Sequence, residues 1–217
     1  EKELSKPYEM IDMVTTPDGS LVAMVHCNNC TSDLNAWVNL FKEYQELLGI
    51  PVDMDELYGK LYNIALTGDT DCGGLLSYNY ISGEPVTGLA EGRPLFVRSA
   101  NDKFNLANFM RAHLYASVGV LKIGNDILFN EEKIKVDRIT GHGGLFRTKG
   151  VGQRVLAAAI NSPISVMETA GEGGAWGIAL LGSYLVNNKK GQSLADFLDE
   201  SVFVSDAGVE VSPTPED

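Results

Sequence analysis

The stretch VDRITGHGGLFRTKG at residues 136–150 carries the strongest indication of the fold. Its first five residues predict a buried strand, ten loop residues rich in glycine follow, and apolar spacing over residues 148–161 predicts a helix. A second strand over residues 164–167 and a second helix over residues 171–186 repeat the order. This alternation is typical of an α/β layer fold, in which ligands gather where a strand runs into a helix.

The sequence on the N-terminal side of this stretch predicts further elements from its periodicity. They are a strand over residues 20–26, helices over 31–48, 53–66 and 104–129, and short strands joined by turns over 73–101. We expect one domain over residues 1–204. The tail over residues 205–217 is rich in Asp, Gly, Ser, Pro and Glu, and we expect it to be frayed.

Composition excludes several classes of protein. The 217 residues hold 17 Lys and Arg against 29 Asp and Glu, a net charge of −12 that repels nucleic acid and anionic membranes. No apolar run is long enough to cross a bilayer, and the first residues lack the apolar core of a signal peptide. Three cysteines make no disulfide framework, so we expect a cytoplasmic protein. Because the sequence does not begin with Met, we expect the chain to be part of a longer protein.

The glycine-rich loop has a plausible binding chemistry. Glycines let a ligand approach the backbone, a following helix N-terminus favours an anion, and Arg147 and Lys149 add positive charge. The pattern is neither Gly-x-Gly-x-x-Gly nor Gly-x-x-x-x-Gly-Lys-Ser/Thr. From the residues alone, a ligand-binding loop and a simple tight turn therefore remain equal alternatives.

The helix predicted over residues 171–186 contains five glycines, at positions 171, 173, 174, 177 and 182. Each glycine in a helix costs about 1 kcal/mol relative to alanine, so some other interaction must offset the cost. We expect this helix, Gly174 included, to pack closely against a neighbouring element.

Several motifs together resemble the C-terminal domain of the FGGY carbohydrate kinases. They are DRITGHGG at residues 137–144, ISVME at 164–168, GEGGAWGIALL at 171–181, NNCTSDLNAW at 28–37 and YISGEP at 80–85. Within the family, the sequence is most similar to xylulose kinases and then to ribulose kinases. The resemblance covers about residues 10–190, although the loop after Gly144 is longer than the family's Ala-Arg-Ser and Pro85 stands where the family has Arg.

The resemblance implies an actin-like, ribonuclease H-like ATPase fold with a mixed sheet flanked by helices. It implies ATP as phosphoryl donor, with Mg2+ carried on the nucleotide, and a sugar bound mainly through an N-terminal domain outside this chain. We assign no catalytic residue and no metal ligand to the chain, expect the fragment alone to be inactive, and leave a homodimer open. The expected nucleotide-binding residues are Gly83, Gly141, His142, Gly143, Gly144, Phe146 and Lys149.

Two other hypotheses about the function remain open. The chain could be a non-catalytic, actin-like module that binds nucleotide for sensing or assembly. Alternatively, Cys27 and Cys30 form a Cys-x-x-Cys pair that could act in redox chemistry, or bind zinc together with Cys72 and a histidine. Asp69 and Asp71 could also bind magnesium, against the simpler alternative of a solvated acidic loop.

Overall fold

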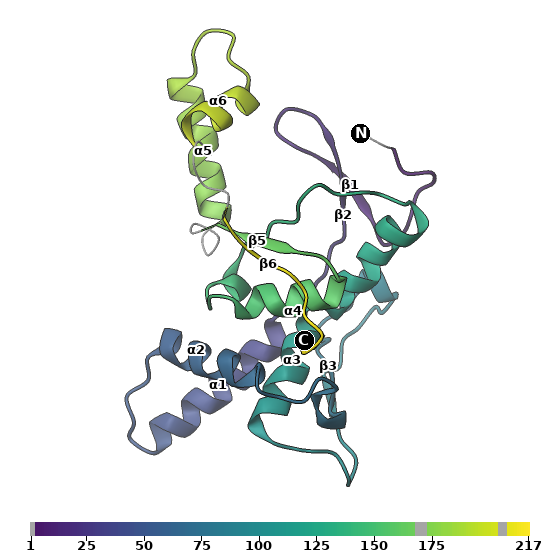
Figure 1. Cartoon of the computed structure of the whole chain (residues 1–217), viewed down its shortest axis with the longest axis vertical. Coiled ribbons are helices and arrows are strands. Elements are labelled where there is room, and N and C mark those ends of the chain that lie inside the picture. Colours follow the sequence, from purple (N-terminus) through teal and green to yellow (C-terminus); the bar gives the residue numbers. More distant parts are fainter. Residues whose placement is uncertain (1–2, 168–172, 204–207) are drawn as a thin grey trace.

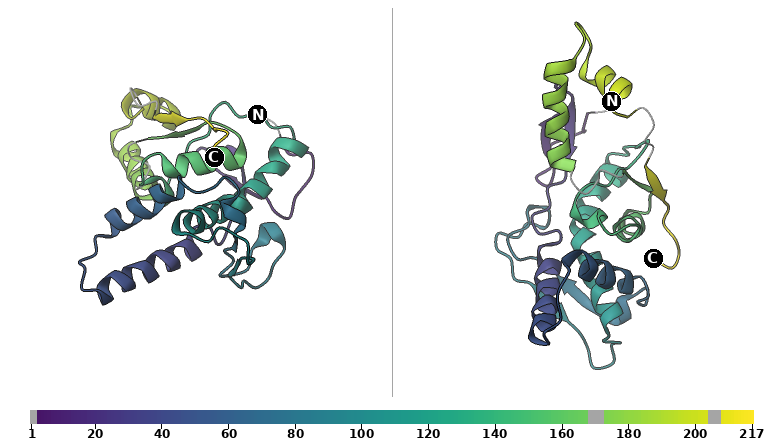
Figure 2. Two further views of the ribbon diagram at one scale, coloured as in Figure 1. Left: turned by 60° about the horizontal axis from the view of Figure 1, so that its bottom comes forward. Right: turned by 90° about the vertical axis from the view of Figure 1, so that its left-hand side faces the viewer.

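The computed structural model describes residues 3–167, 173–203 and 208–217, which form an α/β arrangement of helices and very short strands (Figures 1 and 2). The helices are α1 (Ser32–Leu47), α2 (Met54–Ala65), α3 (Leu106–Asp126), α4 (Val151–Ile160), α5 (Gly173–Asn187) and α6 (Leu194–Ser201). The strands are β1 (Asp12–Thr15), β2 (Leu21–Met24), β3 (Leu76–Tyr78), β4 (Leu95–Val97), β5 (Ile164–Val166) and β6 (Val209–Val211). The predictions of the helices over residues 31–48, 53–66 and 148–161 are confirmed to within a few residues.

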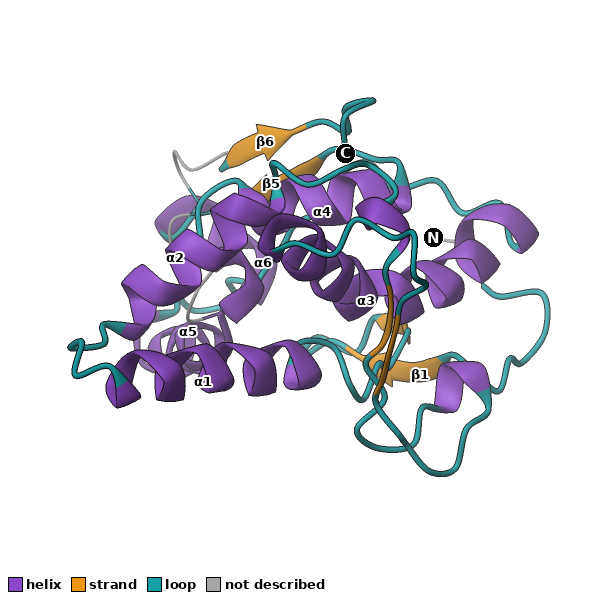
Figure 3. Ribbon diagram, turned by 90° about the horizontal axis from the view of Figure 1, so that it is seen from below, coloured by secondary structure: helices purple, strands orange, loops and turns teal. Residues whose placement is uncertain are grey.

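The core is built around the long helix α3, which lies among α1, α2 and α4 (Figure 3). Met110 and Leu114 of α3 are completely buried, as is Val151 at the start of α4. The Asn105 side chain caps the helix by accepting a hydrogen bond from the Asn108 N–H at 2.9 Å. Apolar residues at three- and four-residue spacing thus bury one face of each helix against α3.

The expected mixed sheet is not found among the described residues, which instead contain three two-stranded antiparallel sheets: β1–β2, β3–β4 and β5–β6. The strand predicted over residues 136–140 is reduced to one parallel bridge from Thr140 to Ser165 in β5. Val136 is still 48% exposed, and only Ile139 and Thr140 reach the half-buried layer. The prediction is therefore wrong in extent, because most of this segment lies in solvent.

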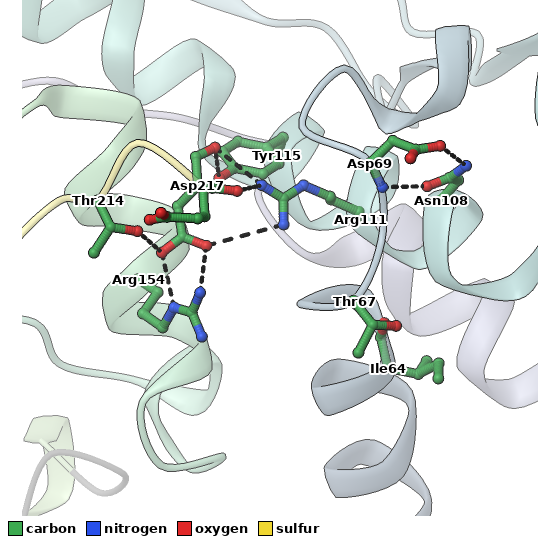
Figure 4. Close-up of polar contacts among 10 residues, drawn as sticks. Ile64, Thr67, Asp69, Asn108, Arg111, Tyr115, Arg154, Thr214 and Asp217 are labelled. Carbon is green, nitrogen blue, oxygen red and sulfur yellow. Dashed lines mark hydrogen bonds and ion pairs between the residues drawn. The ribbon is translucent and has the colours of Figure 1, made fainter.

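The C-terminal tail is packed against the domain, so the expectation that it frays is wrong for residues 208–217. β6 pairs with β5, and the buried Asp217 carboxylate accepts hydrogen bonds from Arg154 Nε and Nη2, both at 2.7 Å (Figure 4). Arg111 donates to the Glu216 carbonyl at 2.8 Å, and Tyr115 donates to the Asp217 carbonyl at 2.7 Å. Burial alone would raise the pKa of Asp217, but the hydrogen bond from Arg154 holds it below its usual value.

Helices α5 and α6 form an arm that stands away from the helical body (Figures 1 and 2). Ring contacts join the two helices and the chain after α6: Tyr184 lies 5.5 Å from Phe197, and Trp176 lies 5.7 Å from Phe203. A Cβ atom added to Gly174 would meet no atom within 4 Å. The prediction that this glycine packs closely is wrong, since α5 turns that face to solvent. Residues 168–172, in the N-terminal part of the glycine-rich segment, lie outside the described residues.

Candidate functional site

A cavity of about 1150 Å³ lies between α2, the segment over residues 144–150 and the β5–β6 pair, with Trp176 of α5 at its edge. Thr31 and Asn35 of the α1 region complete the wall. Small-molecule sites are concave and lined mostly by apolar groups with a few polar ones, and their usual volume is about 300–1,000 Å³, somewhat below that of this cavity.

One wall is the loop that the sequence singles out. Gly143 has φ +109°, a backbone conformation that favours glycine, and it leads into a single helical turn over Gly144–Phe146. The Phe146 N–H donates to the Gly143 carbonyl at 3.0 Å. A Cβ atom added to Gly144 would meet nothing within 4 Å, and Gly144 lines the cavity. A ligand can therefore approach the backbone at this point.

The loop is held in place by two close contacts. A Cβ atom at Gly141 would lie 2.6 Å from the Phe146 ring, so the glycine makes room for that ring to pack against the core. A Cβ atom at Gly152 would lie 2.5 Å from the Leu145 carbonyl oxygen, so the first turn of α4 touches the loop backbone. Both glycines shape the wall without lining the cavity.

The opposite wall is aromatic. Tyr58 and Tyr62 of α2 line the cavity, with their ring centroids 5.6 Å apart in an edge-to-face arrangement. The Tyr58 hydroxyl donates to Asn35 Oδ1 at 3.0 Å, and burial raises the pKa of Tyr58, so the hydroxyl stays protonated. Flat rings with polar tips suit a planar heteroaromatic ligand.

The base of the cavity is tied together by Gln153, a buried residue of α4. Its Nε2 donates to the Ile164 carbonyl at 3.1 Å and to the Val209 carbonyl at 2.7 Å. One side chain thus joins α4 to both strands of the β5–β6 pair, and the tail becomes part of the cavity wall.

The rim of the cavity carries charges of both signs. Arg147 and Lys149 contribute positive charge on the loop side, and Asp55 at the start of α2 contributes the negative charge. Lys149 thus brings positive charge to the side of the cavity next to the glycine turn, in a protein whose net charge is −12.

The predicted site residues fall into three groups. Gly144, Phe146 and Lys149 line the cavity, whereas Gly141, His142 and Gly143 belong to the same loop without lining it. His142 is exposed and lies beside Gly173. Gly83 is not brought to the cavity. Its carbonyl oxygen accepts a hydrogen bond from Asn28 Nδ2 at 3.0 Å. A Cβ atom added to Gly83 would lie 2.4 Å from the Ala90 carbonyl oxygen.

Four residues that line the cavity were not predicted from the sequence. They are Tyr58, Tyr62 and Asn35 on the wall opposite the loop, and Trp176 on the arm. The four-residue spacing of the two tyrosines on an amphipathic helix was the available signal, but nothing local shows which loop that helix faces.

The alternative metal sites are not assembled. Among residues 3–167, 173–203 and 208–217, no three His, Cys, Asp or Glu side chains gather as metal ligands. Asp69 instead accepts from Asn108 Nδ2 at 3.1 Å (Figure 4), and this hydrogen bond lowers the pKa of Asp69. Asp69 also pairs with Lys103 at 3.2 Å. Asp71 accepts from the Gly73 N–H at 2.9 Å, so both carboxylates stabilise the loop that follows α2. Within the described part of the chain, no helix is both long and apolar enough to span a bilayer.

Comparison with known proteins identifies the class. The FGGY family of carbohydrate kinases, C-terminal domain, matches residues 2–186, so the chain belongs to this family. Its fold is therefore that of the C-terminal domain of the sugar kinases, within the actin-like ATPase superfamily. No curated protein matches the chain.

Among solved structures, the chain is similar to the xylulose kinase from Rhodospirillum rubrum. The two share 18% identity with a TM-score of 0.68, over 97% of this chain and 39% of that one. It is also similar to a ligand-bound xylulose kinase from Lactobacillus acidophilus (18% identity, TM-score 0.55, 72% of this chain and 30% of that one). The glycerol kinase of Plasmodium falciparum with ADP matches at 18% identity and a TM-score of 0.51, over 74% of this chain and 30% of that one. The chain thus spans less than half the length of these kinases.

Proposed function

We propose that the chain is the nucleotide-binding domain of an ATP-dependent kinase that phosphorylates a hydroxyl of a pentulose or related sugar. Membership of the carbohydrate kinase family supports the reaction class. The observation that carries the nucleotide assignment is the cavity, where a glycine turn with open backbone faces two tyrosines. The family assignment also leads us to propose a cytoplasmic location.

The residues of the cavity fit the parts of a nucleotide. The rings of Tyr58 and Trp176 and the side chain of Met54 would cover the faces of the base, and the open backbone at Gly144 would admit the nucleoside. Lys149 on the rim would attract the phosphates.

Phosphoryl transfer depends mostly on positioning and on neutralisation of charge. Bound to the nucleotide phosphates, Mg2+ would supply that neutralisation, and the phosphate oxygens would themselves provide ligands. Among the described residues, Asp55 is the carboxylate that lines the cavity.

The residues of the cavity also indicate which part of the reaction this chain contributes and which part the remainder of the kinase contributes. Among the residues that the structure describes, the cavity lining holds no histidine and a single carboxylate, Asp55 at the start of α2, so we assign the general base for a sugar hydroxyl to the remainder of the kinase. We therefore expect this chain to bind adenine nucleotide weakly and to transfer no phosphoryl group by itself.

The experiment is a calorimetric titration of the chain with ADP and Mg2+. We expect saturable binding that is at least tenfold weaker in Gly144→Val, because a branched side chain would fill the space at the loop. The matched control is Gly182→Val on α5, where an added Cβ also meets nothing within 4 Å but which does not line the cavity. Equal affinity of Gly144→Val and the parent would contradict the assignment, and so would sugar-dependent ADP release by the chain alone.

A further inference from the structure

We propose that Cys27 and Cys30 form a redox-active dithiol, in which Cys30 attacks small-molecule disulfides and Cys27 resolves the adduct into an internal disulfide. The pair lies in the connection between β2 and α1, outside the residues that line the cavity. The inference is independent of nucleotide binding.

Hydrogen bonds to buried side chains hold the loop that carries the two thiols. The buried Glu84 carboxylate accepts from the Asn28 N–H at 3.1 Å and from Asn29 Nδ2 at 3.0 Å. Asn29 is 1% exposed, and its Oδ1 accepts from the Ser82 N–H at 2.9 Å. These bonds hold the two residues between the cysteines, so the distance between the thiols is constrained.

The cysteines themselves face each other. The Cys30 thiol donates a hydrogen bond to the Cys27 carbonyl oxygen at 3.5 Å, which holds the Cys30 side chain next to Cys27. Cys30 has φ +33°, and Asn79 Nδ2 donates to its carbonyl at 2.6 Å, which fixes this unusual backbone conformation. Cys30 is exposed, whereas Cys27 is half-buried, so a reagent reaches Cys30 first.

The surroundings of the two thiols also favour Cys30 as the attacking group and Cys27 as the resolving group. The hydrogen bond from Cys27 lowers the pKa of Cys30 to about 7, although partial burial and the Glu84 carboxylate oppose it. The same hydrogen bond, followed by burial, raises the pKa of Cys27. Once Cys30 is modified, Cys27 loses that hydrogen-bond partner and with it the largest cause of its raised pKa.

The chemistry balances with a disulfide as the oxidant. The Cys30 thiolate attacks one sulfur of the small disulfide, the sulfur–sulfur bond breaks, and one thiolate leaves with the electron pair. The Cys27 thiolate then attacks the Cys30 sulfur and releases the second thiolate. The two cysteine thiols are oxidised to one disulfide, and the small disulfide is reduced to two thiols that take up the two protons.

The expected rates follow from the thiolate fraction. At pH 7, a thiol of pKa about 7 is about fifty times more ionised than one at the ordinary value of 9.0. Lower basicity reduces the nucleophilicity of the thiolate by about tenfold, which leaves a rate advantage of about fivefold. Cys27→Ala removes the hydrogen bond, so Cys30 should be alkylated about five times more slowly at pH 7.

The experiment treats the folded chain with glutathione disulfide and measures the intact mass, with Cys72→Ala as the matched control. Cys72 is half-buried and burial raises its pKa, so this control should behave like the parent. The parent should lose two hydrogens through a Cys27–Cys30 disulfide, and Cys27→Ala should keep a glutathione on Cys30. A stable glutathione adduct in the parent, or no reaction in the parent, would overturn the proposal.

A second measurement needs no variant. Iodoacetamide alkylation of Cys30 and Cys72 in the parent, followed by peptide mass analysis across pH 5–10, should give Cys30 a midpoint near 7 and Cys72 a midpoint above 9. Coincident profiles for the two cysteines would also overturn the proposal.

Discussion

The domain should lose stability on mild acidification because His113 is buried as a neutral side chain. The ring is 1% exposed and lies against Phe109 at 4.4 Å and Phe96 at 5.6 Å, measured between ring centroids. Its Nδ1 lies 3.0 Å from the Ser77 hydroxyl, and its buried Nε2 has no hydrogen-bond partner among the described residues. Burial lowers the pKa of His113 to about 4 from 6.5.

The sign and size of the effect follow from proton linkage. Below pH 6.5 the unfolded chain takes up a proton that the folded chain refuses, so the free energy of unfolding falls as the pH drops from 6.5 towards 4. For these two pKa values the loss between pH 7.5 and pH 5 is about 2 kcal/mol. Asp33 Oδ2 lies 3.5 Å from His113 Nδ1, and burial raises the pKa of Asp33. Its protonation offsets the loss only as the pH approaches that raised value.

The assay is urea denaturation of the parent and of His113→Phe at pH 7.5 and pH 5. Phe cannot take up a proton, so the variant should lose about 2 kcal/mol less than the parent between the two pH values, whatever its stability at pH 7.5. The same substitution at the exposed His142 is the control and should keep the pH dependence of the parent. Equal losses in the parent and in His113→Phe would refute the argument.

Three other substitutions test the packing. Gly152→Val should cost about 1–3 kcal/mol, seen as a lower melting temperature, because its Cβ would overlap the Leu145 carbonyl oxygen; unchanged melting would contradict the contact. Arg154→Leu should cost about 2 kcal/mol in urea denaturation, since the buried Asp217 carboxylate loses two hydrogen bonds, and a neutral result would show that the tail contributes nothing. Gly174→Leu should melt at or slightly above the temperature of the parent, because its side chain enters open space and a helical glycine is removed; a clear drop would reveal a contact.

Local patterns were enough to predict helices α1 to α5, whereas α6 was not predicted. Apolar spacing identified α1, α2 and α4, because each buries one face against the core. β1 was missed, because all four of its residues are exposed and no buried pattern marks it. Its pairing with β2 across residues 16–20 is a property of the hairpin and not of either strand alone.

Long-range pairs could not be predicted. The ion pair between Arg154 and Asp217 joins residues 63 apart, and it orders a tail whose composition alone indicates disorder. Because long-range contacts could not be predicted, only the part of the candidate site that lies in the glycine-rich loop was predicted. Its glycine turn is a local motif, but the facing Tyr58 lies in another helix far back in the sequence, and its partnership with Gly144 depends on how α2 packs.

If adenine nucleotide enters the cavity between the glycine turn and α2, its binding changes the surroundings of Trp176, which lines that cavity, and the fluorescence of this residue reports it. The chain has two tryptophans, and Trp37 packs in the core against Phe109, so Trp37→Phe leaves Trp176 as the single reporter at the edge of the cavity. We predict that ADP with Mg2+ changes the Trp176 emission, saturating over the same concentrations as the calorimetric titration of this variant. Calorimetric binding with unchanged Trp176 emission would place the nucleotide elsewhere and contradict the account.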